Sequence, residues 1–178
     1  MKKVTLLMLL IPLLSVFAQE KKITKNGIVN FEASVPSFEP VEAKHNSVSA
    51  VLNTSSGEIA SLALVKGFRF KIALMEEHFN ENYAESTKYP KAIFKGTIQN
   101  FNVNKLTVNP QKFIIKGSLE FHGKTKEISP TAYISKNGDK IEIKSDFKLN
   151  SDDFDIKIPS IVSKKVSKEV NTQIHFIF

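Results

Sequence analysis

The feature that most limits the fold of this chain is a regular alternation of apolar and polar side chains. The clearest run follows Gly138, where Ile141, Ile143, Phe147 and Leu149 alternate with charged residues. Similar runs begin at residues 29, 68, 113 and 170. A period of two is typical of antiparallel strands that bury one face and expose the other to water. We therefore predict an all-β fold built from half-buried antiparallel strands.

Turn-forming residues divide the alternating runs into about eight strands. Asn137-Gly138 lies between two such runs and predicts a hairpin with a two-residue turn. Further turns are indicated at 55–57, 109–110 and 122–124, and less regular strands at His45–Leu52, Glu58–Val65 and Lys126–Ser135. About eight strands with one apolar face close most readily into a barrel, because closure removes exposed strand edges. The predicted architecture is thus a closed antiparallel barrel.

A single short helix is predicted, over Met75–Ser86. Met75, Phe79 and Tyr83 are spaced four residues apart and therefore share one face of it. Pro90 is excluded from a helix interior, so the chain must leave the helix before this residue and then enter a strand. A second helical turn is expected near residues 151–154. We expect the amphipathic helix to border the mouth of the barrel through Phe79 and Tyr83.

The first eighteen residues have the form of an export signal. Lys2 and Lys3 precede an apolar stretch, and a small-residue cleavage site ends at Ala18. The apolar stretch is shorter than the ~20 residues that a membrane-spanning helix needs. We predict cleavage of residues 1–18, a soluble mature domain of residues 19–178, and a periplasmic or secreted location.

The charge of the chain is positive but is not arranged for binding nucleic acid. The net charge is +7, and removal of Lys2 and Lys3 with the signal leaves +5. Arg69 is the only arginine, and the lysines are interleaved with acids along the strands. Proteins that read nucleic acids favour arginine and clustered basic residues, so we exclude this class. Weak contact with an anionic membrane surface is compatible with the charge, and the oligomeric state stays open.

No arrangement of residues in the sequence predicts catalysis or metal binding. His45, His78, His122 and His175 are scattered without the spacing of metal ligands, and the acids at 152, 153 and 155 lack the glycine and glutamate of a calcium loop. The sequence has no Gly-x-Ser-x-Gly segment, no glycine-rich phosphate loop and no cysteine. We predict neither an enzyme nor a protein with a resident metal or cofactor.

An outer-membrane barrel is a second interpretation of the same alternation, because such barrels place apolar residues outside and polar residues inside. The aromatic last residue, Phe178, is compatible with it. Tryptophan is absent, however, and three tyrosines are too few for aromatic girdles. The many lysines on the polar faces would not fit into a narrow lumen. We therefore favour a barrel whose apolar faces point inward.

Three segments of the chain form a recognisable set: a helix followed by Tyr89-Pro90 and Phe94-Lys95-Gly96, a glycine-led strand from Gly117 that runs into His122-Gly123, and the segment from Phe147 to Ile156 with its Asp153-Phe154 pair. In this order the segments resemble the YceI-like family of bacterial secreted proteins. Together they extend over roughly residues 27–178. Ser151 and Asp155 stand where the family usually has arginine and glycine, so the chain resembles a divergent branch.

The resemblance implies an extended, lipocalin-like barrel in a Gram-negative bacterium, with a long isoprenoid lipid such as a polyprenyl chain or a quinone tail held inside it. Fourteen phenylalanines supply side chains of the kind that line an apolar slot. We predict that the lipid contacts Phe31, Phe70, Phe79, Tyr83, Phe94, Ile98, Gly117, Phe121, Ile143 and Phe147. Gly96, Gly117 and Ser145 are expected to leave room for it, so that Gly117→Phe would block the slot without unfolding the protein.

An alternative remains open, because eight strands enclose a space that side chains alone can fill. The same residues would then form a packed core. The protein would be a secreted interaction module without a ligand, and its basic strand faces or its helix would dock a partner protein. A continuous cavity favours the lipid carrier, whereas a filled interior favours the interaction module.

Overall fold

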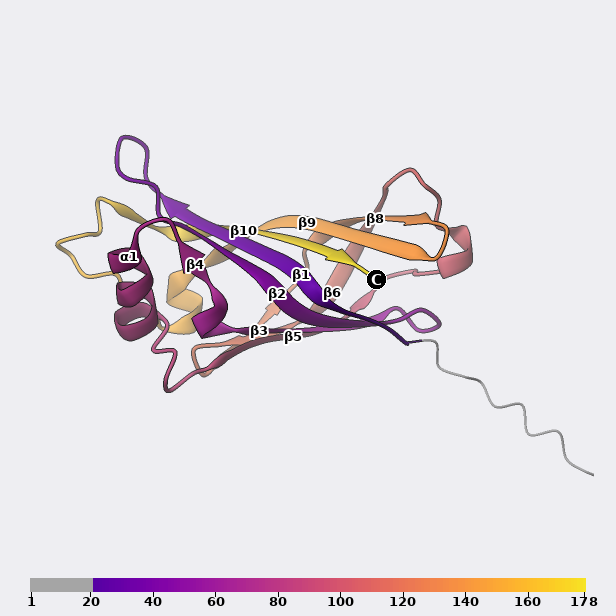
Figure 1. Ribbon diagram of the computed structural model, residues 1–178, viewed down its shortest axis with the longest axis horizontal. Helices are drawn as coiled ribbons and strands as arrows, with labels where there is room; N and C mark the ends of the chain where they lie inside the picture. Colours follow the sequence, from indigo (N-terminus) through magenta and orange to yellow (C-terminus); the bar gives the residue numbers. More distant parts are fainter. Residues whose placement is uncertain (1–20) are drawn as a thin grey trace, which may run out of the picture.

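The computed structural model describes residues 21–178, so the signal predicted over residues 1–18 lies outside the described residues. These described residues form ten strands and five short helical segments, whose arrangement Figure 1 shows. The strands are β1 Lys21–Ser34, β2 Glu42–Asn53, β3 Glu58–Leu64, β4 Arg69–Phe70, β5 Lys91–Ile98, β6 Gln111–Phe121, β7 Lys124–Ile128, β8 Thr131–Asn137, β9 Lys140–Asn150 and β10 Val166–Ile177. The helical segments are η1 Val65–Gly67, α1 Ala73–His78, η2 Phe79–Tyr83, η3 Val103–Lys105 and η4 Ser151–Phe154.

Eight of the strands form a closed ring. The order is β1-β10-β9-β8-β6-β5-β3-β2, and β2 pairs with β1 to complete it. Each pairing is antiparallel. The two remaining strands are additions, since β4 pairs with β2 and β7 pairs with β6. The predicted closed antiparallel barrel of about eight strands is confirmed.

The strand predicted over Lys126–Ser135 is divided in two. β7 and β8 both pair with β6, so together they act as one long antiparallel partner interrupted at residues 129–130. Pro130 has no amide hydrogen to donate to a neighbouring strand. Its carbonyl still accepts a hydrogen bond of 3.0 Å from the amide of Ile115. The break therefore has a local cause that the periodicity alone did not indicate.

The hairpin predicted at Asn137-Gly138 is confirmed. Asn137 pairs with Lys140, which leaves a two-residue connection between β8 and β9. Gly138 has a φ of 58°, in the left-handed region that such tight turns require. This turn fixes the register in which Ile141 and Ile143 point into the barrel.

The predicted short helix is present, but it ends earlier than Ser86. α1 continues into a π-helical turn, η2, and the helical segment ends at Tyr83. Glu85 then adopts a φ of 43°, which turns the chain away from the helix. The predicted second helical turn is confirmed as η4. No helix within residues 21–178 is long and apolar enough to cross a membrane.

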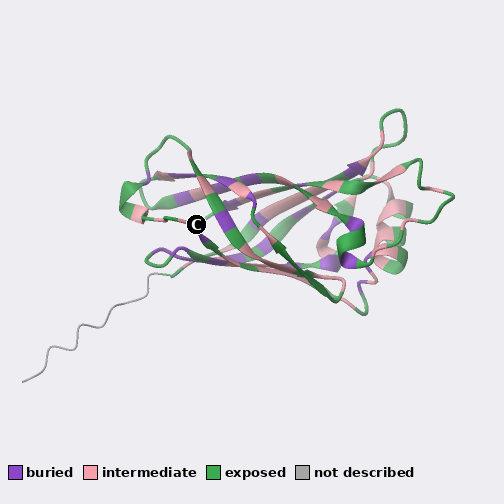
Figure 2. Cartoon of the chain, turned by 180° about the vertical axis from the view of Figure 1, so that it is seen from behind, coloured by how far each residue is buried: buried purple, intermediate pink, exposed green. Residues whose placement is uncertain are grey.

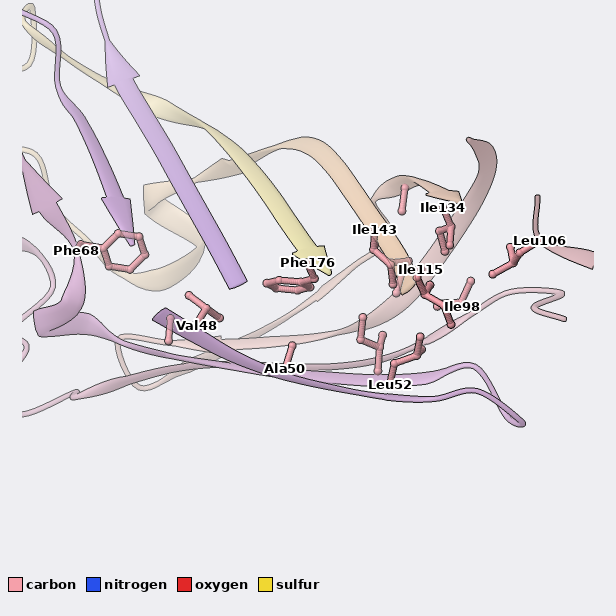
Figure 3. Close-up of a cluster of buried hydrophobic side chains, with 14 of the residues drawn as sticks. Val48, Ala50, Leu52, Phe68, Ile98, Leu106, Ile115, Ile134, Ile143 and Phe176 are labelled. Atoms are coloured by element: carbon pink, nitrogen blue, oxygen red, sulfur yellow. The ribbon is translucent and has the colours of Figure 1, made fainter. Parts of the chain in front are cut away.

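Burial alternates along the strands as the sequence predicts, and Figure 2 shows buried and exposed positions following each other along them. The buried core is mostly apolar, and most strand lysines are exposed. The interior is not uniform along the barrel. Aliphatic side chains gather at one end, where Figure 3 shows Ile98, Ile134 and Ile143 near Leu106, with Phe68 beyond Phe176 on the other side. We call the aliphatic end the filled end. The other end, where α1 lies, is the hollow end.

Candidate ligand cavity

An apolar cavity of about 510 Å³ occupies the hollow end of the barrel. Inward-facing side chains of β1, β3, β5, β6, β9 and β10 form its walls, and residues of α1 and η2 border it. Val48, Ile115 and Phe176 lie where the cavity meets the filled end. The volume lies within the roughly 300–1,000 Å³ that is typical of small-molecule sites.

Four phenylalanines connect the helical segment to the barrel. Phe79 of η2 packs against Phe31 of β1 and Phe70 of β4, with ring centroids 5.3 and 5.2 Å apart. Phe68 contacts Phe31 at 5.2 Å and Phe79 at 5.9 Å. Tilted and edge-on aromatic pairs at these distances are favourable beyond the area that they bury. The cluster therefore holds the helix beside the cavity by side-chain packing.

The rim beside this cluster is held by polar contacts. Arg69 and Glu76 form an ion pair of 2.7 Å, and the second carboxylate oxygen of Glu76 accepts from the amide of Phe70 at 3.1 Å. The start of α1 is thereby attached to β4. Asn80 also donates from its side chain to the carbonyl of Glu76 at 2.8 Å.

A second polar junction joins three segments beside the cavity. Nδ1 of His122 lies 2.8 Å from the carbonyl oxygen of Phe154, and Nε2 lies 2.8 Å from a carboxylate oxygen of Glu85. Both partners are acceptors when Glu85 is ionised, so both contacts are hydrogen bonds only when the imidazole carries two protons. The ring of Tyr89 packs 4.6 Å from that of His122. His122 thus links the turn after β6 to η4 and to the segment that precedes β5.

A buried histidine lies behind Phe68, outside the cavity. The ring of His45 packs edge-on against Phe68 at 5.3 Å, and its Nδ1 accepts from the amide of Ser47 at 3.1 Å. Gly67 passes so close to this ring that a Cβ there would overlap Nε2. Burial is the main cause that lowers the pKa of His45 below 6.5, and the positive charge of Arg69 acts in the same direction.

Seven of the ten residues predicted to contact a lipid line the cavity: Phe31, Phe70, Phe79, Tyr83, Phe94, Phe121 and Phe147. Ile98, Gly117 and Ile143 are outside the lining. Ile98 and Ile143 point inward as expected, but they are buried in the filled end. Periodicity assigned the correct face to these two residues and gave no information on their height along the barrel.

Gly117 does not leave room for a ligand, and the expectation that Gly117→Phe would spare the fold is wrong. Gly117 pairs with Gly96 across β5 and β6. A Cβ at Gly117 would overlap the carbonyl oxygen of Lys95 and would lie 2.6 Å from Cα of Gly96. The two glycines permit a close approach of strand backbones. Ser145, the third residue expected to leave room, is buried and donates to the carbonyl of Thr131 at 2.6 Å.

Several lining residues were missing from the predicted set. Phe68, Phe154, Ile174 and Phe176 all border the cavity. Ile174 and Phe176 lie on the apolar face of the last strand, so the alternation already indicated their orientation. Phe154 is inward because η4 turns it onto Phe121, with ring centroids 5.7 Å apart. A helical turn has no alternation that would have revealed this contact.

Polar side chains are few in the cavity wall and lie mostly toward its open end. Glu39 comes from the β1–β2 loop, His78 from the end of α1, and Lys165 from the segment before β10. Ser61, Asn150, Ser167 and Thr172 are the polar residues within the strands that line it, and Ser151 adds a hydroxyl from η4. The wall is therefore suited to an apolar molecule with a polar group near the mouth.

Comparison with solved structures gives barrels of the same fold at low sequence identity. A polyisoprenoid-binding domain from Saccharophagus degradans, implicated in plant cell wall breakdown, matches with a TM-score of 0.77 at 14% identity, over 88% of this chain and 96% of that one. BcnA from Burkholderia cenocepacia matches with a TM-score of 0.71 at 16% identity, over 85% and 96%. The YceI protein of Campylobacter jejuni matches with a TM-score of 0.56 at 17% identity, over 100% and 98%.

The comparison with curated proteins finds no significant match. The model of the YceI-like domain, by contrast, matches residues 19–178, which include every strand described above. The similarity of the solved structures supports the same fold, with a closed barrel and a short helical segment. By its sequence over almost its full length, the chain belongs to the YceI-like family.

Proposed function

We propose that this protein is an exported carrier that holds the apolar chain of an isoprenoid-type lipid in the cavity. The observation that carries the proposal is a long apolar cavity closed at one end by a packed core. Along β10 the lining side chains extend from Val166 to Phe176. Ten residue steps along a strand are about 33 Å at ~3.3 Å per residue. A space of this length and polarity suits an extended hydrocarbon chain better than a compact polar molecule.

The family relationship supports the same class of ligand. The domain from Saccharophagus degradans that shares this fold is described as polyisoprenoid-binding. A polyprenyl chain or a quinone tail would pack its methyl branches against the phenylalanines of the wall. Its polar end would lie near Glu39, His78 and Lys165 at the mouth, since the strand interior offers few hydrogen-bonding groups.

Export is part of the proposal. Residues 1–18 have the composition of a signal peptide, and residues 19–178 would form the mature domain. A long apolar lipid is nearly insoluble in water, so its movement through the periplasm or outside the cell requires a protein that covers the chain. The proposed location and the proposed cargo are therefore consistent with each other.

The direct experiment is to purify the protein under native conditions from the periplasm of its own cells and to analyse organic extracts by mass spectrometry. A stoichiometric isoprenoid lipid is the expected result. Purified, delipidated protein should also take up ubiquinone or a polyprenyl phosphate supplied in detergent. Absence of lipid from the extract, together with no uptake in vitro, would contradict the carrier function and favour a ligandless interaction module.

A further inference from the structure

The loops around the cavity mouth expose apolar side chains to water. Ile161, in the segment between η4 and β10, is 87% exposed. Phe38, in the β1–β2 loop, is 43% exposed, and Leu74 of α1 is 56% exposed. Figures 1 and 2 show that these three elements lie at the same end of the barrel. Phe38 itself lines the cavity, as does Val162 beside Ile161, so the exposed rim is continuous with the apolar interior.

The segment that carries Ile161 is also strongly basic. Residues 156–168 contain four lysines and no acidic residue. Lys168 pairs with Asp152, but Lys157, Lys164 and Lys165 form no ion pair with any residue in 21–178. Lys157 is exposed between Ile156 and Ile158, which both line the cavity. The segment therefore turns most of its apolar side chains inward and Lys157 and Lys164 outward, whereas Lys165 lies at the cavity mouth and Ile161 is exposed to water.

Turn hydrogen bonds shape the tip that presents Ile161 to solvent. The amide of Val162 donates to the carbonyl of Pro159 at 3.0 Å, and that of Lys165 donates to Val162 at 2.8 Å. The hydroxyl of Ser163 donates to the carbonyl of Ser160 at 2.8 Å. An exposed aliphatic residue held in a fixed turn among unpaired lysines resembles the apolar and basic surfaces of proteins that bind at a membrane interface.

We propose that residues 156–165 and Phe38 form a docking surface for an anionic phospholipid bilayer. Ile161 and Phe38 enter the headgroup region, and Lys157, Lys164 and Lys165 contact the lipid phosphates. The inference rests on the proposed carrier function, since docking would set the cavity mouth against the membrane and let the apolar chain enter without crossing water. The acidic residues of the helix, Glu77 and Glu81, favour an orientation in which the basic segment contacts the bilayer first.

A bilayer fits this surface better than a partner protein does. Stable protein interfaces bury about 800 Å² on each side and are built around a packed, complementary patch. Here the apolar groups are separate tips on different loops, and the lysines between them have no acidic partner. Such tips insert individually into a fluid interface, and an anionic surface attracts each lysine without a fixed geometry.

Vesicle co-sedimentation of the mature protein tests the docking surface. Vesicles of phosphatidylcholine alone are compared with vesicles that also contain phosphatidylglycerol. Replacing Lys157, Lys164 and Lys165 by glutamine should lower partitioning onto the anionic vesicles by about fivefold per lysine and leave the weak binding to phosphatidylcholine unchanged. The double variant Phe38→Ser and Ile161→Ser should bind both kinds of vesicle more weakly.

Matched controls come from the filled end of the same molecule. Val108 is 66% exposed there, and Lys105, Lys112 and Lys140 are exposed lysines without an ion pair to any residue in 21–178. Val108→Ser and the triple glutamine variant of these lysines should bind vesicles as the unchanged protein does. Equal binding by the rim and control variants would overturn the proposal, as would failure of the unchanged protein to bind anionic vesicles.

Uptake of ubiquinone from detergent separates this proposal from the carrier function. Lys157, Ile161 and Lys164 lie outside the cavity lining, so Ile161→Ser and the double variant Lys157→Gln and Lys164→Gln should lose vesicle binding but still take up ubiquinone. This outcome would support docking as a separate step. If the unchanged protein binds vesicles through the rim but takes up no ubiquinone, the carrier function fails while the docking surface stands. Loss of a stoichiometric protein partner from the rim variants, with unchanged vesicle binding, would overturn the membrane assignment.

Discussion

The two ends of the barrel differ in how their interior is filled. At the filled end Ile134, Ile141 and Ile143 are 0% exposed, and Leu106 from the η3 region closes the interior beside them. At the hollow end phenylalanines of β1, β5, β6 and β9 are only partly buried and surround a cavity. Strands β9 and β10 run through both ends with the same alternation. The cavity is therefore not a property of the strand pattern but of side-chain size and of what covers each end.

The largest expected effect concerns Gly117 of β6, where the backbones of β5 and β6 come close together. We expect Gly117→Phe to be the most damaging single change, with a loss of more than about 4 kcal/mol in the free energy of unfolding or a failure to fold. Its side chain would overlap the backbone of β5 whichever end is filled. Urea denaturation followed by circular dichroism measures this. A well-folded Gly117→Phe protein would contradict this prediction, because it would show that β5 and β6 can move apart at this position.

Truncation of an aliphatic side chain should distinguish the filled end from the hollow end. Ile143→Ala would leave a hole in packed surroundings and should cost about 2–5 kcal/mol. Ile174→Ala should cost less, roughly 1–2 kcal/mol, because that partly exposed side chain borders an existing cavity and loses only part of its burial energy. The same denaturation experiment compares the two variants. Equal losses would mean that the hollow end is packed in solution.

Enlargement of an inward alanine should also destabilise the filled end more than the hollow end. Ala132 lies in the filled end, where an added ring must displace neighbours, so Ala132→Phe should destabilise the protein by about 1–3 kcal/mol. Ala92 lines the cavity, so Ala92→Phe has space for its ring and should change the stability little while it reduces ubiquinone uptake. Thermal melts and uptake assays on both variants test this. Normal uptake by the Ala92→Phe protein would contradict the position of the cavity.

The smallest expected effect concerns pH and the hollow end. The pKa of His45 is lowered in the folded protein, mainly by burial, so the unfolded chain binds a proton more readily. The stabilising contribution is complete above the ordinary value of 6.5 and is lost as the pH falls below it toward the folded pKa. The lowered pKa values of Glu142 and Asp155 matter only in more acidic solution. We expect the free energy of unfolding to decline as the pH falls below 6.5. The decline should be smaller in the His45→Gln protein. Stability should be measured by urea denaturation at several pH values. If the unchanged protein and the His45→Gln variant lose stability in parallel as the pH falls, His45 does not contribute to the pH dependence.

The sequence was informative wherever a structural rule has a local period. Alternation gave the inward faces, Asn137-Gly138 gave a hairpin, and Pro90 gave the position at which β5 begins. It was uninformative about position along the barrel axis, which depends on the strand register and the tilt of the whole ring. Ile143 and Phe147 share one face of β9, yet one is core and the other lines the cavity. Gly117 shows the same limit, because only the register against Gly96 reveals what a side chain there would meet.

The pairing of β1 with β10 has a consequence for the order of folding. Ile28 opposes His175, so the ring closes through a contact between the first and last strands of the described chain. Long-range contacts of this kind form slowly, on a scale of milliseconds to seconds in β-rich domains. Until the twelve-residue strand β10 has paired with its neighbours, the barrel has no complete wall and no closed cavity. For the exported protein that we propose, late closure would keep the polypeptide unfolded enough to pass through a narrow translocation channel, and the barrel would form only after the final strand had passed.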